Sequence, residues 1–514
     1  MLLKIRHALL EINNYPNPKL SAIIINNEII ITSGCILKHF VRPLPTTEVS
    51  DSSEGACPST KIIRKLERCE IISTQDGSDE AQHLNALSYQ VTFDRQKLPA
   101  TARNQQPRIL TRYCARPLYM FSSNEITRQF HNFLQNAAVQ VDGHNDVLLS
   151  SFLVLTMRTT REQEKFERFL YHIGHYLRYL HPIRPLDDVL AMCTPFGEEN
   201  FYKSISIGKV SNVIGRDGSL FVVSNALPQG CEGSAVFNNK LRLIGVIICT
   251  TFMRNDGNVN FTIAASFAYL LRDFMKQLGV KITSITVPRE PSNFSWERAM
   301  VAIVADGNQG TGTFVRVQQK KFILTCSHVL YQNSEKVHCR SIDGVFESDV
   351  LWHNPHSNQA FDVALLSAPS NIPNRYFVRL SSRKPSLGLQ IYNAGFPYFA
   401  NVNFDSDFNP SIFQGRIIKC STGAIVTDGC VQAGQSGGPV FDENGCVLGI
   451  CIANTKIDNV IYPNINTAVP ICDIRLILEN FAKTNDITVL NNLVANDEIQ
   501  RVWSLQTPPI LSKL

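Results

Sequence analysis

The chain has 514 residues, a length that predicts two to four domains, each able to bury a core of its own. Apolar residues make up 44% and charged residues 18%, which is ordinary for a globular protein. The net charge of +5 is small for this length and gives no strong argument for nucleic acid or an anionic membrane as a partner.

The N-terminal region predicts strands rather than a leader or a membrane span. Lys4 and Arg6 interrupt the first apolar residues, so they do not form the apolar region of a signal peptide. The most apolar stretch, residues 21–37, is divided by Asn26 and Asn27 and is too short and too polar at its centre to cross a bilayer. Alternation on both sides of this Asn pair predicts a β-hairpin.

Residues 42–110 predict an insert in the first half of the chain. They are rich in Pro, Ser, Thr, Gln and Asp, and residues 44–60 read LPTTEVSDSSEGACPST. Such a segment buries too little apolar surface to offset the entropy of ordering it. We therefore expect this insert to be mobile and open to proteases.

Three segments predict helices. In residues 164–180, apolar side chains recur at helical spacing from Phe166 to Leu180, which indicates a helix packed on a larger body. Residues 266–279 and 472–485 show a similar pattern, and each of them ends one half of the chain.

Two similar strings, QGCEGSAVFNNKLRLIGV at 229–246 and AGQSGGPVFDENGCVLGI at 433–450, indicate an internal duplication. Three further blocks recur around them in the same order. Most segments are short, rich in β-branched residues and bounded by Gly, Asn, Asp or Pro, which favours an all-β architecture of barrels or sandwiches. We expect a first domain at 1–285, a second at 296–485 and a tail at 486–514.

The second copy carries three motifs that together suit nucleophilic catalysis. In GQSGGP, Ser436 lies among glycines, and Gly434 permits a tight turn whose backbone N–H groups converge on one side. LTCSHVL places His328 on a turn after an apolar strand, and FDVALL places Asp362 at the head of another. Taken singly, such a His or Asp is more often structural. Together with the serine they are the parts of a nucleophile activated by an oriented base.

These motifs and GCVLGICIAN resemble those of trypsin-like serine proteases, in the branch that includes the HtrA-like proteases, over roughly residues 300–480. The resemblance implies two tandem trypsin-like double β-barrel domains, each with a C-terminal helix, the first copy being degenerate with inserts. It also implies that Ser436 is the nucleophile, His328 the general base and Asp362 the group that orients the base. The N–H groups of Gly434 and Ser436 would form the oxyanion hole.

The same resemblance places the specificity pocket, with its floor at Cys430 and its far wall at Ala453 and Asn454. No fixed charge stands at Cys430, so a preference for Arg or Lys before the scissile bond is not expected. We expect a small or uncharged P1 residue, such as Cys. The alternative is that a shifted turn brings Asp428 into the pocket.

The first copy lacks the catalytic residues. Aligned on the repeated blocks, Glu232 stands where the second copy has its serine, and Cys35 stands where it has its histidine. NDVLLS suggests Asp146 for the acidic position. A carboxylate at 232 would face the place where negative charge develops, so we expect an inactive domain. It would cover the active domain, bind substrate or form a dimer surface, and these roles stay open.

The sequence predicts no metal site and no cofactor. The fourteen cysteines form no CxxC pair, and His353 and His356 stand in a loop without further ligands nearby. Without a secretion signal, reduced thiols are expected rather than a disulfide framework.

The chain ends in Ser512, Lys513 and Leu514, a receptor-read address for the peroxisome. With the duplication, this ending makes the whole chain resemble the leader-processing proteases of peroxisomes. The resemblance implies a location in the peroxisomal matrix, an import receptor as partner and precursors of matrix enzymes of fatty-acid β-oxidation and ether-lipid synthesis as substrates. It also implies self-cleavage, expected near Cys57 or Cys114, while a homo-oligomer stays open.

Two alternatives are kept. An HtrA-like quality-control protease would usually carry a PDZ domain, but only about 30 residues follow residue 485, against the roughly 80 that such a domain needs. A non-catalytic binding or chaperone module of the same fold is the other alternative, and the full set of three catalytic residue types argues against it.

Overall fold

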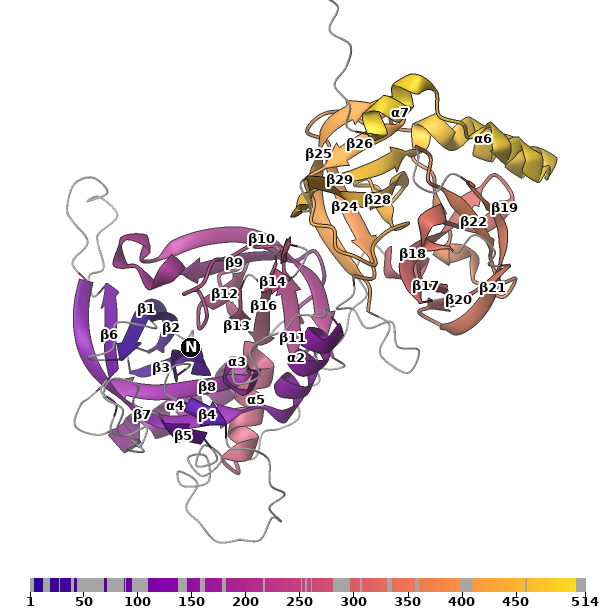
Figure 1. Cartoon of the computed structure of the whole chain (residues 1–514). Coiled ribbons are helices and arrows are strands. Elements are labelled where there is room, and N and C mark those ends of the chain that lie inside the picture. The colour runs from indigo at the N-terminus through magenta and orange to yellow at the C-terminus, as the bar shows by residue number, and fades with distance from the viewer. Residues whose placement is uncertain are drawn as a thin grey trace, which may run out of the picture. The chain divides into compact units, whose positions relative to one another are not determined.

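The computed structural model of the chain separates into two compact units (Figure 1). Unit 1 comprises Met1–Leu134, Gln140–Thr251 and Phe261–Arg289, and unit 2 comprises Gln135–Val139, Phe252–Asn260 and Glu290–Leu514. The structure describes residues 4–12, 19–26, 28–37, 41–43, 69–71, 87, 89–94, 110–136, 146–157, 162–177, 182–215, 218–250, 252–254, 257–259, 261–280, 296–305, 307–330, 335–355, 360–397, 409–457 and 460–504.

Several predictions fall outside these ranges. The targeting residues Ser512, Lys513 and Leu514 lie there, as do the self-cleavage candidate Cys57 and most of the predicted insert at 42–110. The other self-cleavage candidate, at position 114, is described and is exposed on strand β7.

The first half of unit 1 is a closed barrel with the strand order β1-β2-β3-β8-β7-β6. The predicted hairpin is present as β2 and β3, with Ile25 opposite Ile29 and Asn26 in the left-handed region at φ 53°. Every residue of these two strands is buried, because their isoleucine runs pack both inside the barrel and beneath the surrounding elements. The six strands are β1 (Ile5–Ile12), β2 (Leu20–Ile25), β3 (Ile29–Ser33), β6 (Tyr89–Asp94), β7 (Leu110–Ser122) and β8 (Ser151–Met157).

The second half of unit 1 is another closed barrel, with the order β10-β11-β16-β13-β12-β9. Its strands are β9 (Asp188–Cys193), β10 (Ser204–Ile214), β11 (Leu220–Val223), β12 (Ala235–Asn238), β13 (Leu243–Cys249) and β16 (Thr262–Ser266). Unit 1 also contains a small two-stranded sheet of β4 (Val41–Pro43) with β5 (Cys69–Ile71), whereas the two-stranded sheet of β14 (Phe252–Arg254) with β15 (Gly257–Val259) belongs to unit 2.

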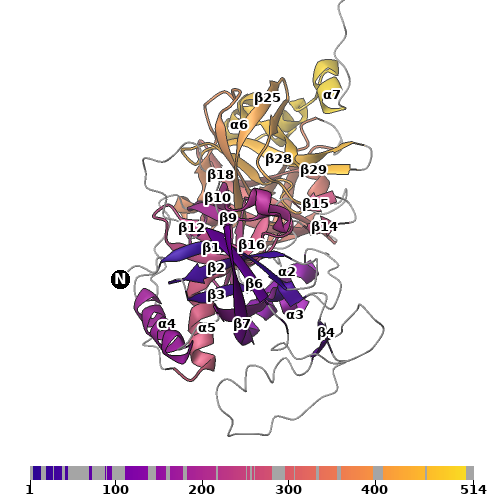
Figure 2. The ribbon, with the colours of Figure 1, turned by 90° about the vertical axis from the view of Figure 1, so that its left-hand side faces the viewer.

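Two predicted helices pack together on unit 1. They are α4 (Glu162–Leu177) and α5 (Phe267–Gln277), which lie side by side in Figure 2. The ring centroids of Phe166 and Phe274 are 6.3 Å apart, in an edge-on arrangement. The Ser266 side chain accepts a hydrogen bond from a backbone N–H in the first turn and so caps α5.

Helix α2 (Asn124–Asn136) and the short α3 (Asp146–Leu149) were not predicted. In α2 the buried residues Ile126, Phe130 and Phe133 recur at helical spacing, so the signal is present in the sequence. Polar residues separate these three positions, so the segment does not stand out as an apolar run.

Unit 2 repeats the architecture. Its first half is a sheet with the order β17-β20-β21-β22-β19-β18-β23, closed by pairing of β17 with β18, and its second half is a closed barrel with the order β24-β25-β26-β29-β28-β27. The strands are β17 (Met300–Ala305), β18 (Asn308–Val317), β19 (Lys320–Thr325), β20 (Lys336–Ser341), β21 (Gly344–His353), β22 (Ala364–Ser367), β23 (Val378–Arg379), β24 (Gln390–Gly395), β25 (Ser411–Ser421), β26 (Ala424–Thr427), β27 (Pro439–Phe441), β28 (Val447–Ile457) and β29 (Val460–Pro470).

The strand orders of the two units match when the strands are taken in chain order. In each unit the first barrel joins its strands as first, second, third, sixth, fifth and fourth, and the second barrel also repeats one order. The predicted fold class, two tandem double β-barrels, is therefore confirmed. Within the described residues, no helix is long and apolar enough to cross a membrane.

The end of unit 2 stays packed beyond the predicted helix, which is present as α6 (Ile471–Thr484). Helix α7 (Asp497–Trp503) follows, and the Trp503 indole N–H donates to the carbonyl of Gly423 at 3.1 Å. Leu490 and Ile499 are buried. Ordered structure thus continues to residue 504, into the segment expected to be a tail.

Candidate active site

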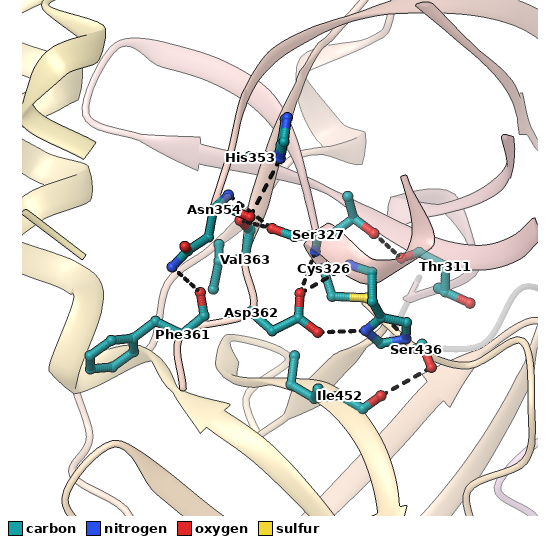
Figure 3. Close-up of polar contacts among 12 residues, drawn as sticks. Thr311, Cys326, Ser327, His353, Asn354, Phe361, Asp362, Val363, Ser436 and Ile452 are labelled. Carbon is teal, nitrogen blue, oxygen red and sulfur yellow. Dashed lines mark hydrogen bonds and ion pairs between the residues drawn. The ribbon is translucent and has the colours of Figure 1, made fainter. Parts of the chain in front are cut away.

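A histidine and an aspartate meet on the first barrel of unit 2. His328 lies in a 3-10 turn, Ser327–Val329, that follows β19, and Asp362 lies just before β22. Strands β19 and β22 are hydrogen-bonded neighbours, so both loops emerge at the same edge of the barrel. His328 Nδ1 is 2.5 Å from Asp362 Oδ2, and Figure 3 labels Asp362 and its contacts.

Backbone groups hold the carboxylate in place. Asp362 Oδ1 accepts hydrogen bonds from the N–H groups of Ser327 at 2.7 Å and His328 at 3.0 Å. The Ser327 hydroxyl donates to the carbonyl of Val363 at 2.6 Å and accepts from the N–H of Asn354 at 2.9 Å (Figure 3). The Asp362 side chain is 2% exposed, so its contact with the imidazole is largely shielded from water. A carboxylate there favours the tautomer with the proton on Nδ1, which leaves the Nε2 lone pair free for other partners.

Ser436 lies on a tight turn of the second barrel. Gly434 has φ 93° and Gly437 has φ 82°, conformations that glycine adopts without strain. Strand β18 fastens this turn from the first barrel: the N–H of Thr311 donates to the carbonyl of Ser436, and its hydroxyl donates to that of Gly434, both at 2.8 Å. The Ser436 hydroxyl donates to the carbonyl of Ile452 at 3.0 Å (Figure 3).

Cys326 is a neighbour of the imidazole that the sequence did not suggest. Its Sγ lies 3.8 Å from His328 Nε2. Burial, with the negative charge of Asp362 nearby, raises the pKa of this thiol well above its usual range. Cys326 is therefore a neutral thiol beside the nitrogen that would serve as the base.

The predicted pocket residues lie on the loop at 429–431 and on strand β28, and hydrogen bonds join this loop to β28 and to its neighbour β29. Asn454 of β28 donates through Nδ2 to the carbonyl of Val431 at 2.9 Å, and Asn466 of β29 donates to the carbonyl of Gly429. The two asparagines are directly opposite each other in the sheet. Cys430 lies between the two bonded carbonyls and is buried, which raises the pKa of its thiol to about 12. Asn466 was not among the predicted pocket residues, although its block recurs in both copies.

The remaining pocket candidates differ in exposure. Ala453 is exposed, on β28 opposite Thr467 of β29. Asp428 is also exposed, and its carboxylate accepts a hydrogen bond from the N–H of Arg416 at 2.5 Å. Its charge is thereby held against the backbone of β25, outside the bonded segments.

Unit 1 repeats the serine turn without the serine. Gly233 and Gly437 have φ 83° and 82°, and a Cβ on either would overlap a threonine hydroxyl, that of Thr32 or Thr325. The residue before each glycine therefore occupies the same place in its unit. The predicted alignment of the two turns agrees with this packing.

Glu232 fills the turn that Ser436 occupies in unit 2. One carboxylate oxygen accepts a hydrogen bond from the N–H of Gly230 at 2.9 Å, and the other accepts from the hydroxyl of Thr250 at 2.6 Å. Gly230 has φ 88° and corresponds to Gly434, a predicted oxyanion donor. The side chain thus occupies one of the donors that an oxyanion would need.

Strand register identifies the residue of unit 1 that corresponds to Asp362. In unit 2, Thr325 of β19 is opposite Ala364, two residues after Asp362. In unit 1, the matching Thr32 of β3 is opposite Leu153 of β8. The corresponding position is therefore two residues before Leu153.

That position is Ser151, so the expectation that Asp146 takes the acidic place is wrong. Asp146 begins α3, and this extra helical turn separates it from β8. Cys35 lies in the 3-10 turn after β3, as expected. The set in unit 1 is Cys35, Ser151 and Glu232, which contains no imidazole base and no serine on the turn.

Comparisons with known proteins agree with this geometry. A family model for the trypsin-like peptidase domain matches residues 310–450. The chain is 25% identical over 360 residues to a Homo sapiens protein named peroxisomal leader peptide-processing protease, and 24% identical over 361 residues to a Mus musculus protein of that name. Each match covers 62% of this chain and 60% of the relative, so the chain matches over about 60% of the length of these curated relatives.

Among solved structures, the active form of the Rv3671c protease of M. tuberculosis is 21% identical. That match covers 40% of this chain and 93% of the other, with a TM-score of 0.30. The residues that match the family model, 310–450, lie in unit 2 and include His328, Asp362 and Ser436.

Proposed function

We propose that the chain is a serine endopeptidase whose chemistry takes place in unit 2. The observation that carries the proposal is the short contact between His328 and Asp362, next to a glycine turn of Ser436 in which a Cβ on Gly437 would lie 2.9 Å from the backbone nitrogen of Cys326. An imidazole oriented by a carboxylate, with a serine on a nearby tight turn, is an arrangement that supports acyl transfer.

In the proposed mechanism, the Ser436 hydroxyl leaves the carbonyl of Ile452 and donates to His328 Nε2. The imidazole takes the proton as the oxygen attacks the scissile carbonyl, and Asp362 stabilises the imidazolium that forms. The N–H groups of Gly434 and Ser436 bind the developing oxyanion. His328 then gives its proton to the leaving amine, and water hydrolyses the acyl-enzyme by the same steps.

We further propose that the pocket formed by Cys430, Ala453 and Asn454 accepts a small or uncharged P1 side chain. We add Asn466 to these pocket residues, because both it and Asn454 donate hydrogen bonds to backbone carbonyls of the loop at 429–431. The polar groups described for these residues are amides and a buried thiol, and the carboxylate of Asp428 is turned to the backbone N–H of Arg416. An arginine or lysine would therefore enter without a partner for its charge.

The relatives named peroxisomal leader peptide-processing protease and the ending Ser512-Lys513-Leu514 support a more specific role. We propose that the chain acts in the peroxisomal matrix on the leaders of imported matrix enzymes, including those of fatty-acid β-oxidation, and that it cleaves itself. An import receptor would bind its C-terminus. Catalysis is assigned to residues 296–485, and residues 1–285 are a degenerate copy.

The test compares the full chain with its Ser436→Ala and Asp362→Asn variants. Labelling by a fluorophosphonate and cleavage of peroxisomal precursors should both vanish in the alanine variant. Asp362→Asn should lower kcat about 10⁴-fold, because the imidazole loses its orienting carboxylate. Labelling that persists in Ser436→Ala would refute the assigned nucleophile. Deleting the last three residues should leave the protein outside peroxisomes, and unchanged import would refute the address.

A further inference from the structure

We propose that unit 2 binds a zinc ion through Cys326 Sγ and His328 Nε2, and that the bound ion switches off the catalytic base. Of the residues that the structure describes, one group of three side chains could hold a metal, and it consists of Cys326, His328 and Asp362. Their candidate ligand atoms all lie within 4.8 Å of one another. The regulatory part of this inference rests on the proposed function, whereas the binding part does not.

The spacing of the two ligand atoms fits zinc. Tetrahedral zinc has bonds of about 2.3 Å to sulfur and about 2.0 Å to nitrogen, which places the two ligand atoms about 3.6 Å apart. Cys326 Sγ and His328 Nε2 are 3.8 Å apart, so an ion can bridge them with a shift of a few tenths of an ångström. A thiolate with an imidazole selects zinc over calcium or magnesium, which prefer oxygen.

Asp362 suits a supporting role rather than direct ligation. Its Oδ1 already accepts from the N–H groups of Ser327 and His328, and its Oδ2 lies 2.5 Å from His328 Nδ1. Carboxylates that bind the far nitrogen of a zinc-bound histidine orient the ring and increase the basicity of the other nitrogen. By holding the proton on His328 Nδ1, Asp362 leaves the lone pair of Nε2 available either to a metal ion or to a proton.

Access to the two ligands differs, and the binding step balances. The His328 side chain is 34% exposed, so an ion can approach Nε2 from solvent and keep water on its remaining coordination positions, whereas Cys326 is 0% exposed and must turn toward the ion to bind it. Cys326 binds as the thiolate: its S–H bond breaks, the proton passes to solvent and the sulfur lone pair forms the bond to zinc. No electron is transferred.

The consequence for catalysis is direct. General base catalysis and zinc ligation use the same lone pair of His328 Nε2, so one excludes the other. Zinc should therefore inhibit proteolysis reversibly, and a chelator should restore it.

The binding experiment uses the full chain with Ser436→Ala, which prevents self-digestion. Zn²⁺ is titrated against a competing chelator, and Co²⁺ is added in parallel because a bound thiolate gives it a charge-transfer absorption. Adding Cys326→Ser should weaken zinc binding at least tenfold and remove that absorption. Cys339→Ser, which changes another buried thiol of unit 2, should do neither. Equal affinity with and without Cys326 would overturn the site.

His328→Ala removes the other proposed ligand and should also weaken zinc binding at least tenfold. Because the His328 side chain is partly exposed, this substitution should disturb the fold less than one at a buried residue. In the active chain, zinc inhibition is measured relative to each variant's own metal-free rate, and Cys326→Ser should raise the inhibitory concentration at least tenfold. If the chain binds zinc but has no protease activity, the metal site stands and the proposed function is refuted. If zinc does not change the protease activity, the proposed inhibition by zinc is refuted and the proposed function stands.

Discussion

The carboxylate of Glu232 accepts a hydrogen bond from the N–H of Gly230 at 2.9 Å, in the turn of unit 1 that corresponds to the serine turn of unit 2. A negative charge is thus already present where a substrate oxyanion would have to form. Thr250 donates to the other oxygen at 2.6 Å and fixes the side chain in this pose. Glu232 thus stands in place of a nucleophilic serine, and its two hydrogen bonds stabilise the turn.

Replacing Glu232 by Ala should therefore destabilise unit 1. The change removes the acceptor of two hydrogen bonds and leaves the Gly230 N–H without a partner, at a cost of about 2 kcal/mol. Glu232→Gln, which retains one acceptor oxygen, should lose less. Hydrogen exchange of the turn and of β13 would report the difference, and equal protection in all three proteins would contradict it.

Glu232→Ser should not create a second active site. The position corresponding to the base holds Cys35, and that corresponding to the acid holds Ser151, so no group would take the proton from a serine. In the Ser436→Ala background, this variant should not react with a fluorophosphonate. Modification at position 232 would show that unit 1 retains a functional base.

Gly437→Ala should damage both stability and activity. Its φ of 82° is costly for alanine, and the new Cβ would overlap the Thr325 hydroxyl and the Thr311 carbonyl. Gly388 is the matched control, since its φ is 76° but nothing lies within 4 Å of an added Cβ. Gly388→Ala should cost about 1 kcal/mol and leave kcat unchanged. Thermal unfolding and turnover of both variants would separate strain from overlap, and equal effects would contradict the overlap.

Gln435 should act as a positioning residue for the oxyanion turn. It is 1% exposed, its Oε1 accepts from the N–H of Gln432 at 2.7 Å, and its own N–H donates to the Gln432 carbonyl at 3.0 Å. Gln435→Met should loosen this closed turn and lower kcat about tenfold or more, with little change in KM. Gln435→Glu keeps the acceptor but buries a negative charge beside the oxyanion turn, so it should not recover the rate. A loss confined to KM would argue against this role.

The stability of unit 1 should fall in mild acid because of His7. Burial lowers the pKa of His7 to about 3, with the nearby Lys203 adding to the shift. Between pH 6.5 and pH 3 the unfolded chain binds a proton at His7 that the folded unit does not. Unit 1 therefore keeps its full free energy of unfolding above pH 6.5 and loses part of it as the pH falls below that value. The loss by pH 5 should be about 2 kcal/mol.

His7→Gln removes this titration, so its stability should change less between pH 7 and pH 5. Hydrogen exchange of β1 and β2 at both pH values measures the effect inside the full chain. The same pH dependence in both proteins would assign the acid sensitivity to other groups.

The duplication, the all-β class and the three motif residues of the second copy follow from the amino-acid sequence. These features depend on local patterns: strand alternation, glycine turns and the residues beside them. Which groups meet across those turns follows instead from the packing of the folded chain. The strand register shows that Ser151, rather than Asp146, corresponds to Asp362, because α3 separates Asp146 from β8. Packing brought Asn466 to the pocket loop and Cys326 to the imidazole, and it bound the Glu232 carboxylate to the N–H of Gly230. Short motifs encode how a turn is built, whereas strand pairing over long separations decides what each turn faces.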